Sequence, residues 1–106
     1  MPSYTPAERR RRAWLITRGV KQAAADAVSP RIEAEIDRID ARADERGRRE
    51  TYAMFDQLDQ AKDAVAAART AERTAPRDTR NAARTARKDA EAALRRTEQA
   101  ARRMGL

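Results

Sequence analysis

The sequence predicts an all-α protein, an elongated three-helix bundle of the coiled-coil type, and three observations support this. Ala, the best helix former, supplies 25 of the 106 residues, and Arg, Glu, Gln and Lys follow Ala closely in helix propensity. Apolar residues recur at alternating intervals of three and four, the spacing of a helical seam. Three of the four prolines stand where a helix would begin.

The apolar content is too low for a large globular core. Of the 41% of residues that are hydrophobic, most are Ala, and Leu, Ile, Val and Phe together number only 12. Chains this poor in large apolar residues form long helices with narrow seams or remain disordered. The high helix propensity favours the first outcome.

The first helix is expected over residues 6–28. Thr5 and Glu8 are spaced as a capping box, and Pro6 suits the first helical position. Pro30 disfavours helical geometry at the residue before it, so Ser29 should end this helix. Residues 1–5 are expected to be flexible.

The second helix is expected over residues 30–73, with Ser29 as its cap. Two apolar runs along it differ in phase, and joining them places Gly47 and Thr51 on the seam, which is a coiled-coil stutter. Gly inside a helix costs about 1 kcal/mol relative to Ala. The helix therefore either breaks near Gly47 or continues through it, and we favour continuity.

The third helix is expected over residues 76–103, after the break at Thr74-Ala75-Pro76 and before Gly105, which should end it. Residues 104–106 are expected to be flexible. The whole chain, residues 1–106, is interpreted as a single helical domain. The interaction seam of the three helices is expected to comprise Ile16, Val20, Ile32, Ile36, Ile39, Met54, Leu58, Val65 and Leu94.

The sequence argues against several kinds of chemistry. It has no Cys and no His, so thiolate and imidazole chemistry is excluded, as are His-ligated and Cys-ligated metals. It contains no Gly-rich phosphate loop and no nucleophile elbow. We therefore expect no enzyme activity, cofactor, metal or small-molecule substrate. There is no membrane-spanning stretch and no export signal, which favours the cytoplasm.

The charge is uneven along the chain. The 24 basic and 17 acidic residues give a net charge of +7, with an acidic centre between two basic ends. In one interpretation, the basic ends lie beside the acidic flank of the second helix and set its alignment. In the other, part of the basic surface remains available to a polyanion, most commonly the phosphates of a nucleic acid.

The first helix carries the clearest candidate surface. We expect Ile16 and Val20 to face the protein, which places Trp14 almost opposite them. Arg10 and Arg18, one turn before and after Trp14, are positioned to stack on its indole. An exposed Trp among arginines suits a nucleic-acid backbone, with the indole stacking on a base or sugar. Alternatively, a second subunit or the third helix buries Trp14 as ordinary core.

The sequence thus favours a non-enzymatic basic helical protein that binds nucleic acid, DNA rather than RNA, through phosphates and with little sequence specificity. The expected contacts are Arg9, Arg10, Arg11, Arg12, Trp14, Arg18, Lys21, Arg77, Arg84, Lys88, Arg95 and Arg102. The alternative is a coiled-coil adaptor or scaffold that binds an acidic protein surface or its own copy. We expect a homo-oligomer, and a membrane surface is the least favoured partner.

Overall fold

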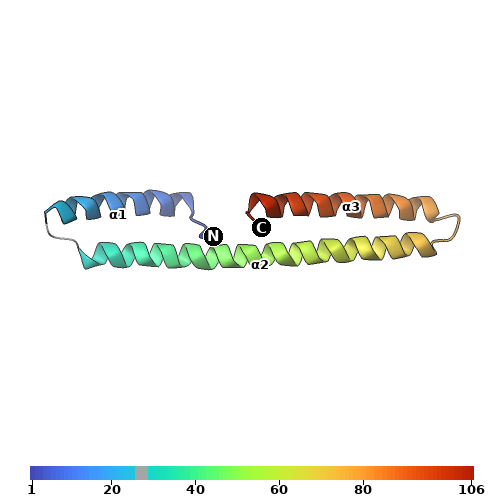
Figure 1. Ribbon diagram of the computed structural model, residues 1–106, viewed down its shortest axis with the longest axis horizontal. Helices are drawn as coiled ribbons and strands as arrows, with labels where there is room; N and C mark the ends of the chain where they lie inside the picture. The colour runs from blue at the N-terminus through green and yellow to red at the C-terminus, as the bar shows by residue number, and fades with distance from the viewer. Residues whose placement is uncertain (26–28) are drawn as a thin grey trace. The chain divides into compact units, whose positions relative to one another are not determined.

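The prediction of an all-α chain with three helices is confirmed. The computed structural model describes residues 1–25 and 29–106, which contain α-helices and no strand (Figure 1). The helices are α1 (Pro6–Ala24), α2 (Pro30–Thr74) and α3 (Arg80–Arg103).

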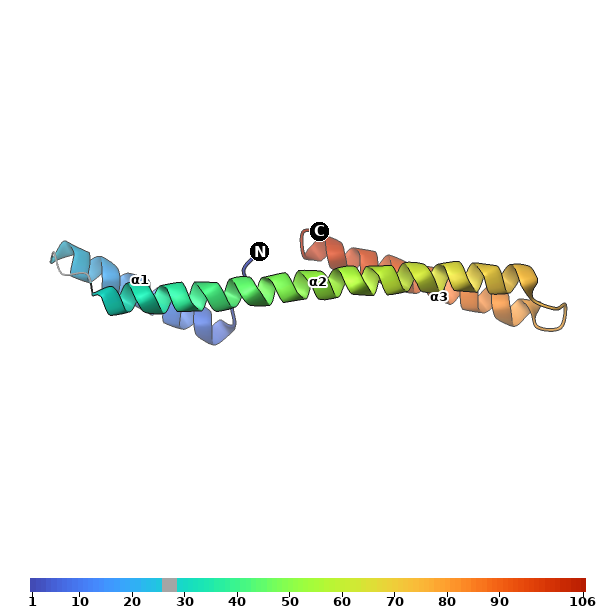
Figure 2. The ribbon, with the colours of Figure 1, turned by 90° about the horizontal axis from the view of Figure 1, so that it is seen from below.

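The chain divides into two compact units, and α2 contributes to both. Unit 1 is Met1–Glu50 and unit 2 is Thr51–Leu106. In unit 1, α1 runs antiparallel beside the first part of α2; in unit 2, α3 runs antiparallel beside the rest of α2 (Figures 1 and 2). Each unit is therefore a helical hairpin, and a single domain over residues 1–106 stays a prediction.

The start of α1 is the predicted capping box. The Thr5 hydroxyl accepts a hydrogen bond from the Glu8 N–H at 3.1 Å, and the Glu8 carboxylate accepts one from the Thr5 N–H at 2.8 Å. The helix ends at Ala24. The predicted end at residue 28 lies outside the described residues.

The helix α2 is continuous through Gly47, which confirms the favoured alternative. Its first turn is capped as predicted, because the Ser29 hydroxyl accepts a hydrogen bond from the Arg31 N–H. The Ser29 N–H in turn donates to the side-chain oxygen of Gln22 in α1, at 2.8 Å. These two bonds fix the beginning of α2 against α1.

Gly47 lies where the N-terminal segment crosses α2. A Cβ atom at this position would come within 1.9 Å of the Met1 carbonyl oxygen, so only Gly permits the approach. Gly47 is buried and Thr51 is partly buried, which confirms that both lie on the seam. The expected flexibility of residues 1–5 is not confirmed, because the Ser3 N–H donates to the Ala43 carbonyl at 2.9 Å.

The prediction of which face of α1 packs against α2 is wrong. Leu15, only 1% exposed, packs with Ile32 and Ile39, whereas Ile16 is 40% exposed and Val20 is 65% exposed. Ile16 and Val20 therefore do not form the contact between α1 and α2 that was predicted for them. Their contact with a second chain stays a prediction.

The physical reason is that the inner face of α1 is largely polar. Its residues are spaced by four and three, as a seam requires, but only one of them is a large apolar residue. A search for apolar periodicity therefore selects the neighbouring face. The inward residues, all buried or partly buried, are Glu8, Arg12, Leu15, Gly19 and Gln22.

The helix α3 begins at Arg80 rather than at residue 76. Residues 77–79 form a turn, in which the Thr79 N–H donates to the Pro76 carbonyl at 3.1 Å. The end at Arg103 is as predicted. Gly105 has a φ of 84° and the Leu106 N–H donates to the Ala101 carbonyl, which together form a Schellman motif. Flexibility of residues 104–106 is therefore not confirmed.

The seam of unit 2 follows the predicted spacing. Val65 and Ala101 are buried, and Met54, Leu58 and Leu94 are partly buried. In unit 1, Ile36 is partly buried beside the cluster of Leu15, Ile32 and Ile39. Both seams are narrow, as the composition predicts.

Candidate functional site

The side of unit 1 on which α1 presents Trp14 gathers basic residues from both helices. Trp14 is 47% exposed, so it is not sealed inside the hairpin. Three adjoining hollows follow this side, with volumes of about 290, 340 and 270 Å³. We call their basic lining, together with Trp14, the basic groove: Arg11, Arg18 and Lys21 of α1, and Arg31, Arg38 and Arg42 of α2.

Two guanidinium groups lie over the indole of Trp14. The Cζ atom of Arg11 is 4.7 Å from the ring centroid and that of Arg18 is 5.1 Å away. Both are within the distance at which a cation is attracted to an aromatic face. The prediction for Arg18 agrees with this arrangement, but the second cation is Arg11, three positions before Trp14, rather than Arg10.

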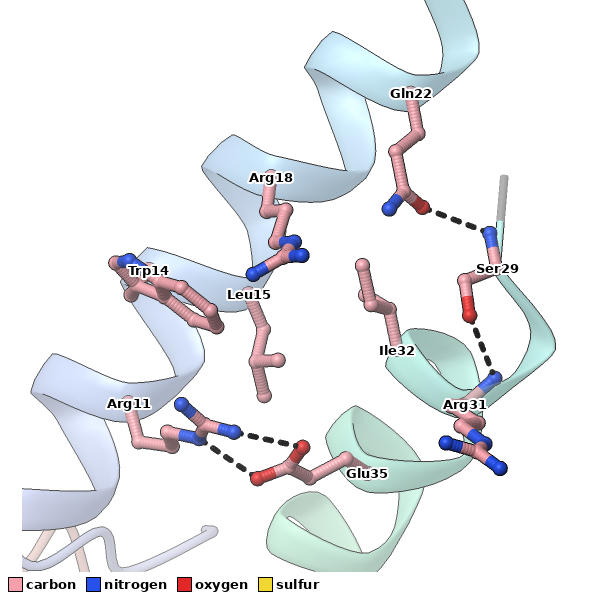
Figure 3. Close-up of a pocket in the computed structure, with 9 residues that line it drawn as sticks. All are labelled: Arg11, Trp14, Leu15, Arg18, Gln22, Ser29, Arg31, Ile32 and Glu35. Carbon is pink, nitrogen blue, oxygen red and sulfur yellow. Dashed lines mark hydrogen bonds and ion pairs between the residues drawn. The ribbon is translucent and has the colours of Figure 1, made fainter. Parts of the chain in front are cut away.

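Arg11 is held in place by a carboxylate of α2. Its Nε and Nη2 atoms donate to the two carboxylate oxygens of Glu35 at 2.7 and 3.1 Å (Figure 3). These hydrogen bonds lower the pKa of Glu35 below its ordinary value. The pairing removes much of the charge of Arg11 from the groove and leaves it as a support for the indole.

The other basic residues of the groove have no such partner. Within residues 1–25 and 29–106, Arg18, Arg31 and Arg38 make no side-chain ion pair, and neither do Lys21 and Arg42. Along the three hollows, five cations thus face two carboxylates, Glu35 and Glu8, each of which is already in an ion pair. A groove of this kind attracts anions whose charges are spaced along a chain.

Arg12 is not part of this surface, although the sequence suggested a phosphate contact. Its Nε atom lies 2.7 Å from Asp40 Oδ1, and its guanidinium lies over the Tyr4 ring at 5.6 Å. The Tyr4 hydroxyl donates to the same Asp40 oxygen at 2.7 Å. Arg12 and Tyr4 hold the pKa of Asp40 below its usual range. Arg12 therefore links α1 to α2.

Arg9 and Arg10 are exposed on α1, and neither forms an ion pair within the described part of the chain. They line none of the three hollows. Conversely, sequence reasoning left Arg31, Arg38 and Arg42 out of the site. The sequence contained a signal for these three residues, because all of them lie on one flank of the seam formed by the isoleucines of α2. Because the inward face of α1 was predicted incorrectly, the flank of α2 that lies next to Trp14 could not be identified.

Unit 2 carries the predicted row of cations, four of them on α3 and Arg77 in the turn before it, and we call this set the α3 row. Arg77, Arg84, Lys88, Arg95 and Arg102 are all exposed. Arg84 lies 3.7 Å from Glu72, and among the residues that the structure describes the other four have no ion pair. Arg87 is turned toward α2 instead, where it contacts Glu72, and it also contacts Glu91 one turn further along α3.

A partly exposed ion pair holds the first turn of α1 to α2. Arg46 Nη1 lies 2.7 Å from Glu8 Oε1 and also donates to the Ser3 carbonyl. The hydrogen bonds from Arg46, followed by that from the Thr5 N–H, lower the pKa of Glu8 to about 2. The link is stable only while Glu8 is ionised.

This link predicts a loss of stability in acid. Glu8 has an ordinary pKa of 4.5 in the unfolded chain and about 2 in the folded one, so the unfolded chain binds the proton more readily as the pH falls through this range. The melting temperature, followed by circular dichroism, should therefore fall between pH 4.5 and pH 2. Glu8→Gln should melt lower than the natural chain at pH 7 and lose less on acidification.

Glu33→Gln is the matched control, because Glu33 is exposed and makes no ion pair with a described residue. It should keep the pH profile of the natural chain. The Glu8→Gln variant should retain part of the decline, since the pKa values of Glu35 and Asp40 are also lowered by ion pairs. A decline as large in Glu8→Gln as in the natural chain would contradict the prediction.

Comparison of the chain with protein-family models, with curated proteins and with solved structures finds no match. Among the described helices, none combines the length and the apolar character needed to cross a membrane. The described residues also contain no group of three or more acidic side chains arranged to hold a metal ion. The candidate site is therefore defined by the geometry of unit 1.

Proposed function

We propose that this protein binds nucleic acid, DNA in preference to RNA, through contacts to the phosphate backbone along the basic groove of unit 1. The observation that carries the proposal is the set of five cations beside the half-exposed Trp14, none of them in an ion pair with a described residue. Arginine forks suit phosphate oxygens, and five of the six basic residues of the groove are Arg.

The α3 row of unit 2 supplies a second, separate set of proposed phosphate contacts. Its members are exposed, and all of them except Arg84, which lies near Glu72, form no ion pair with a described residue, so their charges are available to phosphates. Contacts of this kind position a protein on a duplex without specifying its sequence. The proposed binding is therefore non-enzymatic and weakly sequence-dependent. We propose that it takes place in the cytoplasm.

Salt titration tests the proposal. Five phosphate contacts predict a slope of about −4.5 in a plot of log K against log salt, which is a loss of several hundredfold between about 50 and 200 mM salt. Fluorescence anisotropy with a labelled duplex of about 20 base pairs measures it. Two duplexes of different sequence should bind alike. Absence of binding at low salt, or affinity that does not change with salt, would refute the proposal.

A second candidate function is self-assembly, as in a scaffold protein. It is favoured by Ile16 and Val20, which are one turn apart on α1 and 40% and 65% exposed. Light scattering after size-exclusion chromatography, with and without the duplex, distinguishes the two functions. A defined oligomer that persists after nuclease treatment supports assembly, whereas a monomer that gains mass only with the duplex supports nucleic-acid binding.

A further inference from the structure

Two cations contact the indole of Trp14, and only one of them is held by further contacts. Arg11 is fixed by its two hydrogen bonds to Glu35. Arg18 makes no hydrogen bond or ion pair with any described residue and lies over the indole only through the cation–π contact. Figure 3 shows Arg11 reaching Glu35 while Arg18 ends beside the indole without such a partner. A ligand that stacks on Trp14 can therefore displace Arg18 but not Arg11.

The space around Arg18 is open on both sides of Trp14. One hollow, of about 290 Å³, extends from Trp14 and Arg18 to Arg31 of α2. The other, of about 270 Å³, is lined by Trp14, Thr17, Arg18 and Lys21. A flat ring that replaces Arg18 over the indole would thus have Lys21 and Arg31 nearby to contact the phosphates on either side of it.

From this geometry we infer that the groove selects single-stranded nucleic acid, by stacking one unpaired base on Trp14 in the place of Arg18. The inference rests on the proposed function and deepens it. Within a duplex each base is covered by its neighbours, so stacking on a side chain requires unstacking first, whereas the bases of a single strand are accessible. Base–aromatic stacking is tolerant of sequence, because every base has a flat face. Arg18, once displaced from the indole, keeps its charge available for a phosphate.

The test compares three probes on the full chain at one salt concentration: a single DNA strand of about 20 nucleotides, the RNA strand of the same sequence, and the DNA duplex. The natural chain should bind the DNA strand about tenfold more tightly than the duplex. Because Trp14 is the only tryptophan, its fluorescence should be quenched by the strand and much less by the duplex. The RNA strand shows whether stacking extends to both kinds of nucleic acid.

Trp14→Leu should lower the affinity for the single strand about tenfold or more and change the affinity for the duplex less than threefold. Trp14→Phe, which keeps an aromatic ring, should retain most of the preference. Tyr52→Leu, which removes another exposed aromatic residue, is the control and should bind as the natural chain does. Circular dichroism confirms that each variant keeps its helices.

Two outcomes overturn the inference, and they are distinguishable. If the natural chain binds both DNA probes equally, or if Trp14→Leu weakens both to the same extent, the stacking site is refuted while salt-dependent phosphate binding stands. If no probe binds at low salt, the proposed function fails and the inference fails with it.

Discussion

Replacing Leu15 by Ala should reduce the free energy of unfolding by roughly 2–4 kcal/mol. Leu15 is 1% exposed and forms the core of unit 1 with Ile32 and Ile39. Truncation of a fully buried Leu removes its transfer free energy and leaves a cavity. In a core of three large side chains little remains to fill that cavity, so α1 should separate from α2. Urea unfolding followed by the fluorescence of Trp14, which lies on α1, measures the effect.

The neighbouring aliphatic residues provide matched controls. Ile16→Ala and Val20→Ala remove side chains that are 40% and 65% exposed, and exposed substitutions of this kind change stability by about 0.5 kcal/mol or less. All three variants increase or preserve helix propensity, so that propensity does not explain a difference. If Ile16→Ala destabilised the chain more than Leu15→Ala, the inward face of α1 would be the one predicted from apolar spacing, contrary to the structure.

Removing three cations from the basic groove should weaken duplex binding on the order of a hundredfold at about 0.1 M salt. In the combined variant Arg18→Gln, Arg31→Gln and Arg38→Gln, each change removes one phosphate contact. Each contact contributes about 0.9 to the salt slope, so the slope should fall by nearly three. None of the three side chains forms an ion pair with a described residue, and the fold should therefore be unaffected.

A second triple variant separates local contacts from net charge. Arg73→Gln, Arg96→Gln and Arg103→Gln remove the same charge from exposed positions of unit 2 that lie outside both the groove and the α3 row. The loss of affinity should be several times smaller than for the groove variant. Equal losses would show that binding depends on overall charge, which would contradict the assignment of the groove.

The fold was predictable to the extent that it depends on local chemistry. Thr5 and Glu8 cap α1, and Ser29 and Pro30 begin α2, because capping is decided within one turn of helix. Gly105 ends α3 for the same reason. The continuity of α2 through Gly47 was the favoured one of two alternatives that the sequence left open. These signals are all contained within a few neighbouring residues.

The inward face of α1 and the position of the N-terminal segment depend on contacts between residues that are distant in sequence. Arg12 and Asp40 are 28 residues apart, and the contact of Met1 with Gly47 spans 46. No local pattern states which Arg meets which carboxylate. The candidate site was therefore predicted only in part: Arg11, Trp14, Arg18 and Lys21 of α1 were named from the sequence, whereas the contribution of α2 appeared only with the packing.

The polar links between α1 and α2 have a consequence for alignment. The seam between α1 and α2 is narrow and has only one large apolar residue from α1, so apolar packing alone distinguishes weakly between alignments that differ by one turn. Arg11 with Glu35, Arg12 with Asp40 and Arg46 with Glu8 would all be separated by a slide of one turn. Each pair is partly solvated and adds little energy by itself, but together they penalise slippage and select one alignment of the hairpin.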